Sequence, residues 1–132
     1  MSTTGDGAGV KITLDFLPPE ECSPKWHGPK SKQSKAKRVT REATCMAAKS
    51  VAAEPLEYVY VDILCVCATE QYRDPDNWGV RCEPIINGLR DAGVIKFNDI
   101  RHLILRVHFK VDEAGAPKTI ITVSKVGGNK ND

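Results

Sequence analysis

The sequence predicts an α+β two-layer sandwich, in which a mixed four-stranded sheet packs against two helices. Three observations support this: a length of 132 residues that fits one domain, four segments with alternating apolar residues, and two segments with a helical apolar repeat. These segments follow one another in the order β-α-β-α-β-β. Strands gathered in one layer and helices in the other bury one face of each layer.

The four strand segments differ in how much of each should be buried. The first begins at Val10 and ends at the two prolines that follow Leu17. The second, residues 58–68, is rich in β-branched residues and is typical of a central strand. The third, residues 103–111, alternates and so has one solvated face. A loop containing glycine and proline joins it to the last strand, residues 119–124.

Two helical segments lie between these strands. The first begins at about Ser34, and its apolar stripe is expected to face the core. The stripe consists of Val39, Ala43, Met46, Ala47 and Val51. The second pattern runs from Trp78 to Gly93, but Pro84 interrupts it. A proline inside a helix costs about 3 kcal/mol, so either the helix kinks there or a second helix begins with Pro84.

The globular domain is predicted to cover residues 10–126, with disordered tails at residues 1–9 and 127–132. The five cysteines are odd in number, and the N-terminus lacks the pattern of a secretion signal. We therefore expect a protein of the reducing cytoplasm. No apolar run approaches the roughly 18 residues of a membrane span, so no membrane partner is expected.

Positive charge is concentrated between Cys22 and Ser50, although the net charge of the chain is only +2. This segment, a long loop followed by the first helix, contains eight basic residues and one acid, Glu42. Neutralising phosphates releases bound counterions, so the segment favours a polyanion, although a solvated helix face is the alternative. The predicted phosphate-binding residues are Lys25, Lys30, Lys32, Lys35, Lys37, Arg38 and Arg41. Trp26, in the same loop, either stacks on an unpaired base or packs against the sheet.

Acidic and amide side chains follow the predicted central strand, in the segment Arg73-Asp74-Pro75-Asp76-Asn77. Asp74 can cap the next helix with Pro75 at its first position, which explains one aspartate. Alternatively, Asp74 and Asp76 converge on a hard cation, Mg²⁺ or Mn²⁺. Asp99 would then be the third donor, because it opens the third strand and can lie beside the end of the second. The residues alone leave both interpretations open.

Cys65 and Cys67 share one strand face, and the chain also has three histidines, which raises the question of a zinc site. A Cys-x-Cys pair alone lacks the paired spacing of zinc ribbons, and cysteines in a valine-rich strand are usually small buried hydrophobes. We therefore predict no zinc site and expect His102 and His108 to be exposed strand residues.

Three segments together resemble the RusA family of Holliday junction resolvases. They are Tyr72-Arg73-Asp74-Pro75-Asp76-Asn77-Trp78, residues 84–95 (Pro-Ile-Ile-Asn-Gly-Leu-Arg-Asp-Ala-Gly-Val-Ile) and Asn98-Asp99. The family pattern is Arg-Asp-x-Asp-Asn, then a helix end Asp-x-Leu-x-x-Ala-Gly, then an aspartate. The first strand with its proline ending, the basic loop at residues 23–27 and the order of elements are also similar.

The resemblance implies a homodimeric, Mg²⁺-dependent endonuclease that cuts Holliday junctions and other branched DNA in recombination and repair. It implies that Asp74, Asp76 and Asp99 are catalytic metal ligands, and no small-molecule cofactor is expected. Arg73 and Arg81, which flank the first two aspartates, complete the predicted DNA-binding set. The resemblance also suggests a phage or prophage setting.

The sequence departs from the family at a lysine in the helix after the paired aspartates. That position is Glu83 when placed from Pro84, or Val80 when counted from Asp76, and neither residue is cationic. Arg81 could supply the charge, although an arginine stays protonated and is a poor proton donor. Two alternatives follow: a junction-binding protein that cuts weakly or not at all, and a nucleic-acid-binding module whose aspartates only cap a helix.

Overall fold

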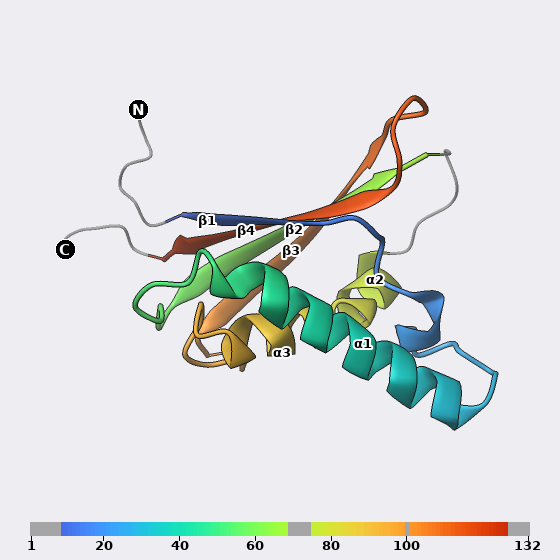
Figure 1. Ribbon diagram of the computed structural model, residues 1–132, viewed down its shortest axis with the longest axis horizontal. Coiled ribbons are helices and arrows are strands. Elements are labelled where there is room, and N and C mark those ends of the chain that lie inside the picture. Colours follow the sequence, from blue (N-terminus) through green and yellow to red (C-terminus); the bar gives the residue numbers. More distant parts are fainter. Residues whose placement is uncertain (1–8, 69–74, 100, 127–132) are drawn as a thin grey trace.

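The computed structural model describes residues 9–68, 75–99 and 101–126, with the backbone alone for residues 75–77. A four-stranded sheet forms one layer and the helices cover one of its faces (Figure 1). This confirms the predicted α+β class and the mixed sheet. The predicted tails lie outside the described residues, except for Gly9.

The strands are β1 (Val10–Leu14), β2 (Val59–Cys67), β3 (Leu103–Val111) and β4 (Lys118–Lys125). Their order across the sheet is β1-β4-β2-β3. β2 pairs parallel with β3 and antiparallel with β4, and β1 pairs antiparallel with β4. The parallel pair is joined by a crossover through helices on one face, the usual connection between parallel strands.

The helices are α1 (Lys30–Lys49), α2 (Pro75–Arg81) and α3 (Glu83–Asp91), with a short 3₁₀ helix, η1 (Glu20–Cys22), after the first strand. α1 begins earlier than predicted. The break between α2 and α3 at Cys82 confirms the second interpretation of Pro84, which is the second residue of α3. Gly93 follows α3 with φ +84°, a conformation that glycine adopts without strain. No helix in the described ranges is both long and apolar enough to cross a membrane.

The core lies between the sheet and the helices. The inward face of β2 is fully buried from Val59 to Cys65, and Cys67 is 3% exposed. Cys65 and Cys67 are therefore buried small hydrophobes, as expected. Ile85 and Leu89 of α3 are fully buried against the sheet, and Trp78 of α2 packs edge-to-face on Phe109, with ring centroids 5.4 Å apart.

The predicted buried stripe of α1 is only partly correct: Ala47 packs against the core and Ala43 is half-buried, but the larger members are exposed. Val39, Met46 and Val51 are 49%, 75% and 41% exposed, whereas Thr40, Thr44 and Ala48 are buried. The reason is the close approach of α3, which brings Gly88 against α1 and favours small side chains there. The Thr44 hydroxyl donates to the Thr40 carbonyl at 2.8 Å, so its burial leaves no unpaired donor.

Arg41 and Asp91 join α1 to the end of α3. The Arg41 guanidinium donates two hydrogen bonds to the Asp91 carboxylate, Nε at 2.5 Å and Nη2 at 2.9 Å. These bonds favour the charged carboxylate and lower the pKa of Asp91. Part of the Arg41 charge is therefore compensated within the protein.

Candidate functional site

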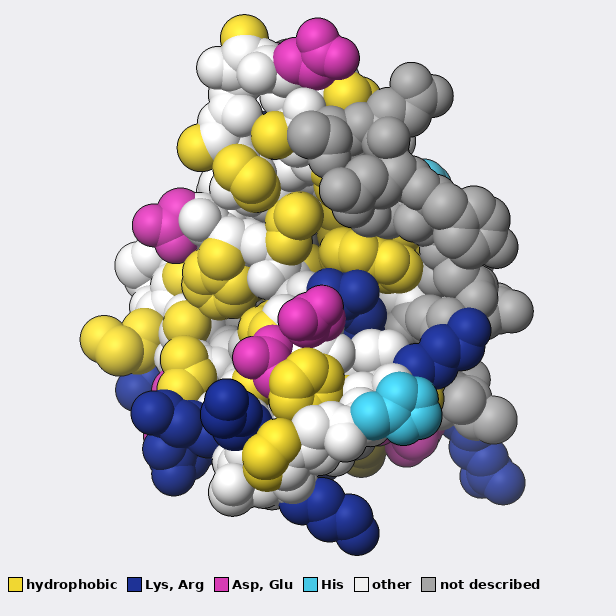
Figure 2. Space-filling view, turned by 90° about the vertical axis from the view of Figure 1, so that its right-hand side faces the viewer, with side chains coloured by type: hydrophobic (Ala, Val, Ile, Leu, Met, Phe, Trp, Pro, Cys, Tyr) yellow, Lys and Arg dark blue, Asp and Glu magenta, His cyan; other side chains and the backbone are white. Residues whose placement is uncertain are grey.

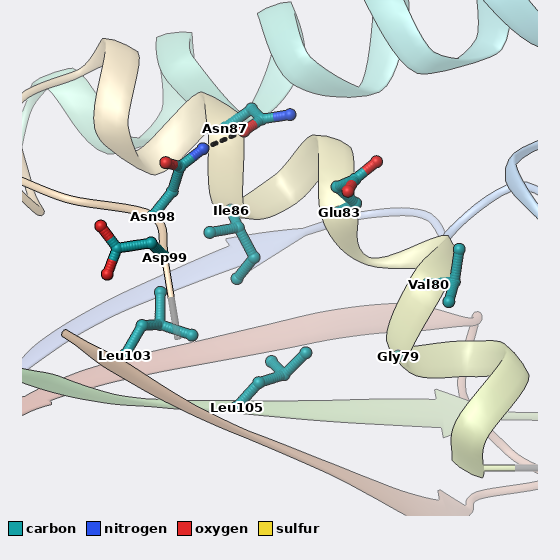
Figure 3. Close-up of a pocket in the computed structure, with 9 residues that line it drawn as sticks. All are labelled: Gly79, Val80, Glu83, Ile86, Asn87, Asn98, Asp99, Leu103 and Leu105. Atoms are coloured by element: carbon teal, nitrogen blue, oxygen red, sulfur yellow. Dashed lines mark hydrogen bonds between the residues drawn. The ribbon is translucent and has the colours of Figure 1, made fainter. Parts of the chain in front are cut away.

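A pocket of about 380 Å³ lies between α2, α3 and the start of β3 (Figure 3). Its apolar wall consists of Val80, Ile86, Leu103 and Leu105. Its polar lining consists of Glu83, Asn87, Asn98 and Asp99, and the Asn98 amide donates to Asn87 Oδ1 at 2.7 Å. Two stretches of the chain, residues 79–87 and 98–105, therefore meet around this pocket.

Asp99 lies on the loop before β3, with 52% of its side chain exposed. Its Oδ1 accepts hydrogen bonds from the Arg101 backbone N–H at 3.0 Å and from His102 Nδ1 at 2.7 Å. The bond from His102 favours the charged form and lowers the pKa of Asp99. An ionised carboxylate therefore stands at the edge of the pocket near neutral pH.

His102 is not the exposed strand residue that the sequence predicted. Its side chain is only 17% exposed and lies between two aromatic rings. Its ring centroid is 4.2 Å from that of Phe97 and 4.9 Å from that of Tyr58. Nothing in the hydrophobic pattern indicates this contact, because Tyr58 comes from a distant segment of the chain.

The sheet places Asp99 differently from the prediction. Because β2 and β3 are parallel and Val59 pairs with Leu103, the residues before β3 lie beside the start of β2. The predicted position beside the end of β2 is therefore wrong. The pocket is lined by the later residues of α2, Gly79 and Val80, whereas the helix starts on the side away from Asp99 (Figure 3).

The lining offers oxygen donors, which are the ligands that Mg²⁺ and Mn²⁺ prefer. Asp99 and Glu83 supply carboxylates, and Asn87 and Asn98 supply amide oxygens. Figure 3 shows the Glu83 and Asp99 carboxylates at opposite ends of the pocket, so the described lining does not bring them together around one cation. Among the described residues no group of three or more His, Cys, Asp or Glu side chains could hold a metal ion. Asp74 and the side chain of Asp76, the other two predicted ligands, lie outside the described residues.

A basic groove of about 280 Å³ lies on the other side of α3, between this helix and α1. Lys37, Arg38 and Arg41 line it from α1, and Glu83 and Asn87 line both the groove and the Asp99 pocket. The cations of this groove and the Asp99 carboxylate thus lie on opposite sides of α3.

The remaining predicted DNA-binding lysines surround the start of α1. Lys25, Lys30, Lys32 and Lys35 are all exposed. Figure 2 shows the end of the molecule where α1 begins; Lys and Arg side chains project around its lower part, and hydrophobic side chains cover much of its centre and left. Arg73 lies outside the described residues.

Arg81 contacts the protein itself. Its Nη2 donates to the Pro18 carbonyl at 2.7 Å, and its guanidinium carbon lies 3.8 Å from the Trp78 ring centroid. These contacts connect α2 to the segment after β1, and Arg81 does not line the Asp99 pocket. Its proposed replacement of the family lysine stays a hypothesis, which cleavage by Arg81→Ala would test.

Trp26 packs on its own loop rather than on the sheet. Its indole Nε1 donates to the Pro29 carbonyl at 3.2 Å. A Cβ at Gly28 would lie 2.2 Å from the Trp26 ring, so only glycine fits there while the ring keeps this position.

No protein-family model matches the chain, and no curated protein matches it. The resemblance to RusA resolvases therefore rests on the motif residues and the order of elements.

Proposed function

We propose that the chain is a Mg²⁺-dependent endonuclease of the cytoplasm that resolves Holliday junctions and other branched DNA as a homodimer. The observation that carries this proposal is the shared pocket. Asp99 and the later residues of α2, Gly79 and Val80, line one hollow, and the basic groove of Lys37 and Arg38 lies across α3. A nuclease that acts on the DNA backbone needs this combination of oxygen ligands and phosphate-binding cations.

The charges define separate roles for the two hollows. Lys37 and Arg38 would hold phosphates by charge, which gives affinity without reading base edges. Asp99 repels a phosphate, so we expect the scissile group to approach it only when Asp99, with Asp74 and Asp76, holds a divalent cation. A cation bound there supplies an activated water and stabilises the leaving oxygen. Two-fold symmetry would set two such sites for paired cuts.

The direct test is incubation of the protein with a synthetic four-way junction, with and without Mg²⁺. We expect nicked duplex only in the presence of Mg²⁺, measured by denaturing gel electrophoresis of labelled strands. A matched linear duplex serves as the control for structure selectivity. Tight junction binding without any product would overturn the nuclease proposal.

Tight junction binding without cleavage would define the alternative function, a junction-binding protein with weak or no cleavage. A specific observation favours it. Val80 and Glu83, the two positions where the family lysine could lie, both line the Asp99 pocket, and the charged residues of its described lining are acidic. The pocket thus lacks a described cation to assist at the scissile phosphate.

DNA affinity should fall steeply with salt. Counterion release gives a log–log slope of roughly −0.9 per neutralised phosphate, so loss of one contact makes the slope shallower by about one. We expect Arg38→Glu to weaken junction binding and reduce the slope, as measured by fluorescence anisotropy at several salt concentrations. Lys118→Glu, an exposed lysine on β4, changes net charge equally and should have the smaller effect. A flat salt response of the wild-type protein would exclude an electrostatic interface.

A further inference from the structure

Arg41 lines the basic groove between α1 and α3 in a defined orientation, although 44% of its side chain is exposed. Nε and Nη2 donate to the two oxygens of the Asp91 carboxylate, at 2.5 Å and 2.9 Å. Two parallel bonds of this kind fix the plane of the guanidinium as well as its direction. A long exposed cation normally loses rotamer entropy when it binds a ligand, and the pairing with Asp91 removes much of that cost in advance.

The pairing leaves part of the guanidinium for a ligand. An arginine carries five N–H donors, and the bonds to Asp91 use two of them. Asp91 does not use the edge formed by Nη1 and the second N–H of Nη2. This edge can take two oxygens of a phosphate in the same forked geometry, which a lysine ammonium cannot reproduce.

The helix on the other side of the groove supplies a second oriented donor, the Asn87 amide of α3. Its Oδ1 accepts a hydrogen bond from Asn98 Nδ2 at 2.7 Å, and Asn98 Oδ1 accepts one from Arg90 Nη1 at 3.4 Å. Figure 3 shows the Asn87 amide nitrogen on the side away from Asn98. Because Asn87 also lines the basic groove, its N–H donors can bind an anion there.

The two carboxylates of α3 have different relations to this groove. Glu83, at the start of the helix, lines the groove and repels an anion in it. Asp91, at the other end of the helix, does not line the groove and acts on it through Arg41. Loss of these two negative charges should therefore change anion binding in opposite directions.

We propose that one phosphate of the DNA backbone binds between Arg41 and Asn87, and that Asp91 is the positioning residue that holds Arg41 for it. This inference rests on the proposed function, because it takes the anion in the groove to be DNA phosphate. It gives an acidic residue outside the predicted DNA-binding set a favourable role in binding a polyanion. Lys37 and Arg38 then add attraction that depends on charge alone.

The experiment compares two substitutions that remove the same charge from α3. Affinity of the full-length protein for a labelled four-way junction is measured by fluorescence anisotropy without divalent cation. Asp91→Asn should weaken binding roughly 3- to 10-fold, equivalent to about one hydrogen bond, because an amide can accept only one of the two bonds from Arg41. Glu83→Gln is the matched control and should tighten binding, because it removes only a repulsion.

Two further variants separate positioning from the packing of α1 on α3. Arg41→Lys keeps the charge and can still pair with Asp91, so the helices stay joined, but it lacks the fork and should bind several-fold more weakly. Asp91→Glu keeps a carboxylate for Arg41 and should recover most of the affinity that Asp91→Asn loses. Urea denaturation of each variant checks that the fold is retained.

The possible outcomes distinguish this inference from the nuclease proposal. If Asp91→Asn tightens binding as Glu83→Gln does, or if Arg41→Lys binds like the wild type, the positioned phosphate site is wrong and the nuclease proposal stands. If the expected pattern appears but Mg²⁺ gives no cleavage, the phosphate site is supported and the nuclease proposal fails. If the wild type does not bind the junction, both are wrong.

Discussion

Replacing Asp76 by asparagine should abolish junction cleavage and leave junction binding unchanged or tighter. Asparagine keeps the size of the side chain and its position in the first turn of α2, but removes the negative charge that a hard cation requires. We expect the loss of rate to exceed the roughly 10- to 100-fold that follows loss of a neighbour of a metal ligand. Binding should not suffer, because one repulsion between protein and phosphate disappears. Single-turnover cleavage and anisotropy without divalent cation measure the two effects separately.

The matched control is Asp15→Asn, an exposed aspartate after β1 that does not line the pocket. It makes the same chemical change elsewhere on the surface and should cut like the wild type. If Asp76→Asn also cuts normally, Asp76 has no catalytic role. Asp76 would then contribute only to the stability of the fold. Its contribution would be below about 1 kcal/mol, the usual effect of a charge near a helix N-terminus.

The strands and the split helix were predictable because each depends on a local pattern. Alternation placed β3 correctly, since one face of this strand is exposed and the other half-buried. Pro84 divided the helical segment because proline cannot continue a helix from within. The face of α1 could not be read in the same way. Hydrophobicity selected Val39 and Met46, whereas the close contact with Gly88 requires small side chains such as Thr44.

The position of Asp99 could be predicted only in part. Asp99 was identified from the motif, and it does line a pocket together with residues of α2 and α3. Its place beside the end of β2 was wrong because β2 and β3 run parallel, so the start of one lies beside the start of the other. The burial of His102 depends on Tyr58, which is distant in the sequence and becomes a neighbour only through this pairing.

Gly88→Ala should destabilise the protein by about 2 kcal/mol. An added Cβ would lie 2.6 Å from the Arg41 carbonyl oxygen and 2.7 Å from the Thr44 Cβ, and neither atom can rotate away, because one is backbone and the other is fixed to it. Overpacking typically costs about 1–3 kcal/mol, and we expect this contact to cost close to the upper value. Alanine has a higher helix propensity than glycine by about 1 kcal/mol, which offsets part of that cost. Urea denaturation measures the difference, and a fall in Tm on the order of 5 °C or more should accompany it.

Gly79→Ala is the matched control, because it makes the same change within a helix where a Cβ meets nothing within 4 Å. It should be neutral or stabilising by up to about 1 kcal/mol. The two variants should also differ in function. Gly88→Ala separates α1 from α3, which widens the groove that Lys37 and Arg38 share with Asn87, and junction affinity should fall even where the protein remains folded. Equal stability of the two variants would mean that α1 and α3 are not closely packed at Gly88. The described geometry of the basic groove between these helices would then be wrong.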